Sequence, residues 1–118
     1  MNEKERLSIE VNNATMNFVK AIRIMVKART LPLRKSIKPF DYTFELLEWV
    51  FAKPQILQGD EIVEACNPSS GEELAMSIAI DLEHILCVLS IPIRRIPEWL
   101  AWEKACDAQD KFLRENKK

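Results

Sequence analysis

The sequence predicts an all-α protein, folded as a compact four- to five-helix bundle around a buried central helix at about residues 70–90. The stretch from Glu73 to Ile91 is the most continuously apolar part of the chain. Glycine occurs at only 2 positions, which disfavours β-hairpins because their tight turns depend on glycine. Elsewhere, apolar residues recur at the three- and four-residue spacings of amphipathic helices that can cover the central one.

A single all-helical domain is expected for residues 1–118, because this length is typical of one domain and no linker or repeat divides it. The N-terminal segment is charged and holds no apolar stretch of the signal-peptide type, so a cytoplasmic protein is predicted. Cys66, Cys87 and Cys106 have no CxxC spacing and are interpreted as reduced thiols, with Cys87 inside the core.

The first helix is predicted over residues 5–29, with its end near Thr30 because Pro32 follows. Its apolar face comprises Leu7, Val11, Ala14, Phe18, Ala21, Ile22, Met25 and Ala28. Residues 30–40 contain two prolines and no clear period, so they are interpreted as a connector that crosses the surface. Its apolar residues either tuck under the bundle or form a surface for a partner.

A second helix is predicted over residues 42–53, with Asp41 as its N-cap and Pro54 as its end. Its inner face comprises Phe44, Leu47, Val50 and Phe51, and Trp49 is placed beside that face as a core residue. A short third helix is expected from Glu61 to Cys66, with Asp60 as its cap.

The central helix at about 70–90 is preceded by two capping boxes, formed by Ser69 with Glu72 and by Ser70 with Glu73. Pro92 is the predicted stop. One wide apolar face comprises Leu74, Ala75, Ile78, Ala79, Leu82, Ile85, Leu86 and Leu89, of which Ile78, Leu82, Ile85 and Leu89 are predicted to be fully buried. Further apolar residues extend that face almost all round, which predicts burial on nearly every side: Met76, Ile80, Cys87 and Val88.

One narrow polar stripe interrupts the central helix, formed by Glu73, Ser77, Asp81 and His84. It is interpreted as the side that faces solvent or a partner. The polar groups near the middle of the helix argue against a membrane span.

After a short extended link, Ile91 to Pro97, a last helix is predicted over residues 97–115, with Pro97 in its first turn. Its inward residues are predicted to be Trp99, Trp102, Cys106, Phe112 and Leu113.

Charge is segregated along the chain, although the net charge is only -1. Residues 11–40 hold no acid, and residues 41–93 hold a single Lys or Arg, Lys53. The bases of the first segment are Lys20, Arg23, Lys27, Arg29, Arg34, Lys35 and Lys38. Three interpretations stay open: pairing with the acidic middle of the same chain, a nucleic-acid patch, or a surface for an acidic protein.

The sequence contains only weak candidates for a catalytic site or a metal site. Ser77, Asp81 and His84 are the residue types of a catalytic triad, but Ser77 and His84 lie two turns apart on one helix, about 10 Å along its axis. A metal site from Asp81 and His84 would need a further carboxylate such as Glu45 or Glu48. Glu-x-x-Glu pairs resemble half of the magnesium signature of all-helical nucleotide pyrophosphohydrolases, but the later Glu-x-x-Asp is missing. No catalytic residue, metal or cofactor is therefore predicted.

The function predicted is that of a non-catalytic protein-interaction module, such as a small adaptor, an inhibitor or immunity-type protein, or a small subunit of an assembly. Self-association or a protein partner is expected, and a membrane is not. The candidate partner-binding residues are Asp60, Glu61, Glu64, Glu72, Glu73, Arg94, Arg95 and Trp99. The alternative is a nucleic-acid-binding subunit that uses the bases of residues 20–38.

Overall fold

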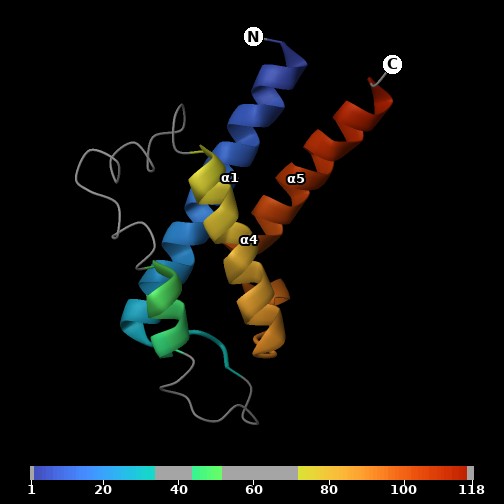
Figure 1. Ribbon diagram of the computed structural model, residues 1–118. Helices are drawn as coiled ribbons and strands as arrows, with labels where there is room; N and C mark the ends of the chain where they lie inside the picture. Colours follow the sequence, from blue (N-terminus) through green and yellow to red (C-terminus); the bar gives the residue numbers. More distant parts are fainter. Residues whose placement is uncertain (1, 34–43, 52–71, 117–118) are drawn as a thin grey trace, which may run out of the picture.

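The computed structural model describes residues 2–33, 44–51 and 72–116, and this part of the chain contains helices and no strand. The all-α fold class is therefore confirmed. The elements are α1 (Glu3–Ala28), α4 (Glu72–Val88), the 3₁₀ turn η1 (Ile93–Arg95) and α5 (Pro97–Glu115), and residues 44–51 are helical as well (Figure 1). The predicted helix from Glu61 to Cys66 and the capping serines of the central helix lie outside the described residues.

α1 is the long helix against which α4 and α5 both pack. It runs in the opposite direction to α5, so the N-terminal end of α1 and the C-terminal end of α5 lie at the same end of the molecule (Figure 1). With 26 residues, α1 is about 39 Å long. α5 begins and ends where the sequence predicts. Pro97 lies in its first turn, where the backbone N–H that proline lacks would have no partner within the helix.

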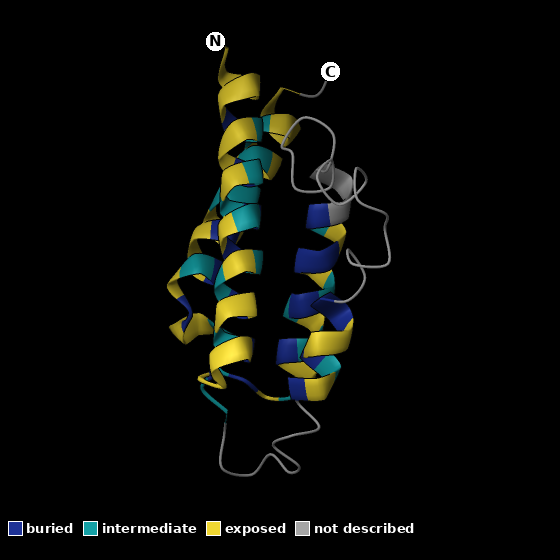
Figure 2. Cartoon of the chain, turned by 90° about the vertical axis from the view of Figure 1, so that its left-hand side faces the viewer, coloured by how far each residue is buried: buried dark blue, intermediate teal, exposed yellow. Residues whose placement is uncertain are grey.

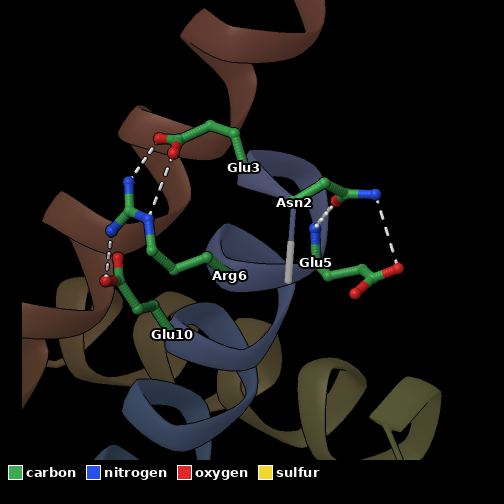
Figure 3. A network of polar contacts seen from close by, with 5 residues as sticks. All are labelled: Asn2, Glu3, Glu5, Arg6 and Glu10. Atoms are coloured by element: carbon green, nitrogen blue, oxygen red, sulfur yellow. Dashed lines mark hydrogen bonds and ion pairs between the residues drawn. The ribbon is translucent and has the colours of Figure 1, made fainter.

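The N-terminus of α1 is fixed by local polar contacts (Figure 3). The side-chain oxygen of Asn2 accepts a hydrogen bond of 2.8 Å from the backbone N–H of Glu5, and the Asn2 side-chain amide donates to the Glu5 carboxylate at 3.4 Å. This reciprocal pair of contacts makes Asn2 the N-cap of the helix. It starts the helix at Glu3, two residues before the predicted start, because the apolar period by which the helix was predicted begins later than its cap.

α4 ends in a Schellman motif, before Pro92 is reached. Ser90 adopts the left-handed conformation with φ 58°, and the N–H of Ile91 donates to the carbonyl oxygen of Leu86 at 2.9 Å. The N–H of Ser90 donates to the carbonyl oxygen of Cys87 at 3.0 Å. The backbone therefore turns at Ser90, and Pro92 acts only after the helix has ended.

Replacing Ser90 with glycine is expected to raise the free energy of unfolding by about 0.5–1 kcal/mol. A left-handed conformation crowds the Cβ of any other residue, although the added freedom of glycine in the unfolded chain offsets part of the gain. Thermal or urea unfolding of Ser90→Gly measures the change. Ser90→Ala is the control, and it should give no stabilisation because alanine keeps the Cβ. A Ser90→Gly protein less stable than Ser90→Ala would contradict this account of the turn.

The link between α4 and α5 is not extended as predicted. Pro92 to Ile96 form a tight 3₁₀ turn, in which the N–H of Arg95 donates to the carbonyl oxygen of Pro92 at 3.0 Å and the N–H of Ile96 donates to that of Ile93 at 2.9 Å. The turn shortens the link so that Ile91 on one side and Ile96 on the other both reach the core. Burial of these two side chains favours the turn over an extended backbone.

The core lies between the facing sides of the helices, where Figure 2 shows the buried residues in dark blue. Phe18 of α1 is 0% exposed and its ring stacks on that of Trp102 of α5, with ring centroids 5.2 Å apart. The other residues of the main core cluster are Ile22, Val26, Leu31, Phe44, Leu47, Val50, Phe51, Ile78, Ala79, Leu82, Leu86, Ile91, Ile96 and Trp99. The buried hydroxyl of Thr15 donates to the carbonyl oxygen of Val11 at 2.6 Å, so it does not oppose burial.

Several burial predictions need correction. Ile85 and Leu89 are half-buried rather than fully buried, whereas Ile78 and Leu82 are buried as predicted. The central helix is not buried on nearly every side, because Ile80 and Val88 are exposed. Trp49 and Cys87, which were predicted as core residues, are exposed as well. Of the residues predicted to point inward on the last helix, Leu113 is exposed, and Phe112 and Cys106 are half-buried. Leu31 of the connector is buried and Leu33 is half-buried, so its described part tucks under the bundle.

Candidate functional site

The outward side of α4 carries exposed apolar residues. Ile80 is 53% exposed and Val88 is 67% exposed, and the exposed His84 and Cys87 lie on the same side at the spacings of one helical face. We call Ile80, His84, Cys87 and Val88 the α4 stripe. The inner side of the helix, with Leu82 and Leu86, faces the core, whereas the four residues of the stripe are exposed.

The predicted polar stripe of α4 overlaps this side. Ser77 and His84 are exposed and Asp81 is half-buried, whereas the side chain of Glu73 lies outside the described residues. Ser77, Ile80 and Asp81 line a cleft of about 470 Å³ together with residues of the N-terminal half of α1 and with Gln109 of α5. The polar and the apolar residues of the outward side therefore alternate, and one helix face presents both.

The outward side of α1 carries bases. Lys20, Arg23 and Lys27 are exposed, and none of them forms an ion pair within the described residues. Ile24 lies among them and is 66% exposed. We call Lys20, Arg23, Ile24 and Lys27 the basic face of α1. Several acids of the middle segment that could pair with these bases, such as Asp60, Glu61 and Glu64, lie outside the described residues. The interpretation of pairing within the chain therefore stays a prediction.

The remaining bases of the predicted nucleic-acid set are placed differently. Arg29 adopts the left-handed conformation at the end of α1, with φ 54°, and its guanidinium lies 5.0 Å from the centre of the Phe44 ring, which is a cation–π contact. Arg29 is thereby tied to the helical residues 44–51 rather than to the basic face. Arg34, Lys35 and Lys38 lie outside the described residues.

The predicted partner-binding residues are only partly brought together. Asp60, Glu61 and Glu64 lie outside the described residues, and Glu72 and Glu73 form the first turn of α4. Arg94 and Arg95 are exposed on η1. Trp99 is buried in the core, so the greater part of its ring is not available to a partner.

A second cleft, of about 700 Å³, opens where α4, η1 and α5 meet. It brings Arg94 and the edge of Trp99 together with Glu83, Cys87 and Glu103. The indole N–H of Trp99 donates to the Glu83 carboxylate at 2.8 Å, which holds that carboxylate at the wall of the cleft. Neither glutamate was predicted as a site residue. Glu83 lies sixteen residues before Trp99 in the chain, and no spacing rule connects them.

Of the two described cysteines, Cys106 is poorly suited to nucleophilic chemistry. Burial raises the pKa of Cys106 to about 11, and the neighbouring carboxylates of Asp110, Asp107 and Glu83 add to the rise. Its thiol therefore stays protonated at neutral pH and is a weak nucleophile. Cys87 is exposed on the α4 stripe. Within the described residues, no group of three His, Cys, Asp or Glu side chains is arranged to hold a metal ion.

No protein-family model, no curated protein and no solved structure matches this chain. Within the described residues, no helix combines the length and the apolar character needed to cross a membrane.

Proposed function

We propose that this protein is a non-catalytic helical module that binds another protein in the cytoplasm, as an adaptor, an inhibitor or immunity-type protein, or a small subunit of an assembly. The observation that carries the proposal is the α4 stripe. Ile80 and Val88 lie on a helix whose inner side already packs into the core. Because both side chains are largely exposed, they add little apolar burial to the stability of the folded monomer.

The composition of the stripe distinguishes it from scattered surface residues. Single exposed apolar side chains are normal on any protein. Here Ile80, Cys87 and Val88 recur along one face of one helix, together with His84 and the half-buried Asp81. A row of exposed apolar residues beside a few polar groups is typical of a surface that another helix or sheet covers.

The proposal is tested by replacing Ile80 and Val88 together with serine. Gel filtration with light scattering measures self-association, and affinity capture with quantified recovery measures a bound protein. Wild type is expected to be an oligomer or to retain one partner reproducibly, and the Ile80→Ser, Val88→Ser double variant is expected to lose that association. Burial of two aliphatic side chains of this size is worth about 1.5–3 kcal/mol each, enough to weaken binding at least tenfold.

A matched control uses the exposed leucines of α5. Leu100 and Leu113 are the exposed leucines of α5, which also packs against α1. The Leu100→Ser, Leu113→Ser double variant should keep the association, and both double variants should unfold at the same temperature as wild type to within a few degrees. A monomeric wild type that retains no protein, or an equal loss in both double variants, would overturn the proposal.

The alternative function, a nucleic-acid-binding subunit, has one observation in its favour. Lys20, Arg23 and Lys27 are exposed and carry no ion pair within the described residues, as phosphate-binding side chains need to be. The same exposure serves an acidic protein segment equally well. The bases by themselves therefore do not favour nucleic acid over protein.

A further inference from the structure

We propose that the basic face of α1 binds an acidic helical segment of a partner protein, in which an apolar residue lies between two acids. This inference rests on the proposed function, since it assumes a protein partner. It concerns α1 rather than α4, so the two proposals depend on different residues and can fail separately.

The spacing of the basic face determines what it can contact. Lys20, Ile24 and Lys27 lie at positions i, i+4 and i+7 of a continuous helix, so they share one side and span about 10 Å, which is two turns. All three are exposed, and the larger part of the Ile24 side chain faces solvent. A partner helix of two turns, with an acid, an apolar residue and an acid at the same spacings, presents the complementary pattern.

The charge of this face is not balanced by its own helix. No acid occurs from Val11 to the end of α1, so the bases have no partner at i±3 or i±4. The N-terminal half of the same helix is different, because Arg6 donates there to the carboxylates of Glu3 and Glu10 (Figure 3). α1 therefore pairs Arg6 with its own acids at one end and leaves Lys20, Arg23 and Lys27 available for an external anion at the other.

Ile24 favours a protein over nucleic acid as that anion. A phosphate backbone offers many contacts to lysine and arginine side chains, but it has no apolar group that could cover an exposed isoleucine. An acidic helix with a leucine between its acids satisfies both the charge and the apolar side chain at once. On its N-terminal side the basic face is bounded by the uncharged Asn13 and Asn17 and then by Glu10, which would repel a polyanion that extended in that direction.

The test uses a synthetic helical peptide with the spacing Glu-x-x-x-Leu-x-x-Glu, labelled with a fluorophore and titrated with the full-length protein. Fluorescence anisotropy is expected to show saturable binding that weakens as salt is raised. The Lys20→Glu, Lys27→Glu double variant should abolish binding. Ile24→Ser keeps every charge and should weaken binding roughly tenfold through loss of the apolar contact.

α5 supplies the matched control. Lys104 and Lys111 are both exposed and have the same seven-residue separation as Lys20 and Lys27. The Lys104→Glu, Lys111→Glu double variant changes the net charge equally, so it should leave the affinity for the peptide nearly unchanged. Equal loss in both double variants, or equal affinity for a peptide with serine in place of its leucine, would show non-specific attraction and overturn the inference.

A short DNA duplex, titrated in parallel, distinguishes the other class of partner. Retention of the duplex that depends on Lys20 and Lys27 but not on Ile24, without peptide binding, would replace this inference with the nucleic-acid alternative. If the peptide does not bind while a partner is still lost in the Ile80→Ser, Val88→Ser variant, the inference about α1 is wrong and the proposed function stands. Failure of both experiments removes both proposals.

Discussion

Replacing Leu82 with alanine is expected to lower the free energy of unfolding by about 2–5 kcal/mol. Leu82 is 0% exposed and lies at the middle of the inner side of α4, within the main core cluster. Truncation removes three carbon atoms and leaves a cavity that the neighbouring helices fill only in part. Because a domain of this size has a total stability of about 5–15 kcal/mol, the loss is a large share of it.

Chemical denaturation of Leu82→Ala measures this loss directly, provided that both proteins unfold in one cooperative transition. Ser77→Ala is the control on the same helix, since Ser77 is exposed and its replacement should change stability by less than about 0.5 kcal/mol. Equal and small losses in the two variants would show that the inner side of α4 does not belong to the monomer core.

Replacing Phe18 with alanine is expected to cost about 3–5 kcal/mol, the larger of the two effects. The Phe18 ring is fully buried between α1 and α5 and stacks on Trp102 with an interplanar angle of 23°. The variant loses both the apolar burial and the contact between the rings. The control is Ile24→Ala on the same helix, which should cost little because Ile24 faces solvent.

A double-mutant cycle with Phe18→Leu and Trp102→Leu separates the ring contact from simple burial. The coupling between the two sites is expected to be about 0.5–1.5 kcal/mol, measured as the departure of the double variant from additivity. Additive losses would mean that the two rings contribute only through the apolar surface that each one buries.

The helices themselves could be predicted from the sequence, because the spacing of apolar residues and the residues that start or end a helix are local signals. The last helix follows from Pro97 and the spacing of Trp99 and Trp102, and its bounds agree with the structure. The inner side of α4 follows equally from the spacing of Ile78 and Leu82. Both predictions use only residues within one helix, so they need no knowledge of what surrounds it.

The exposed sides could not be predicted in the same way. The apolar residues of α4 occur almost all round the helix, which indicates burial only if neighbours exist on every side. α1 covers one side of α4, whereas Ile80 and Val88 face outward. The number and position of neighbouring helices is a property of the whole fold, and the local period contains no information about it.

The candidate sites show the same division. The run of bases in α1 is visible in the sequence, but its lack of ion pairs within the described residues and the exposure of Ile24 become visible only in three dimensions. The contact of Trp99 with Glu83 joins the start of one helix to the end of another. Such a contact depends on the turn at η1, which was predicted as an extended link.

The pairing of the first long helix with the last has a consequence for synthesis of the chain. α1 leaves the ribosome before α5, and the ring of Phe18 acquires its stacking partner only when Trp102 of α5 has been made. At about 5–20 residues per second, the interval between the end of α1 and the start of α5 is roughly 3–14 s. During that time the nascent polypeptide exposes an apolar helix face, which is the kind of surface that molecular chaperones shield.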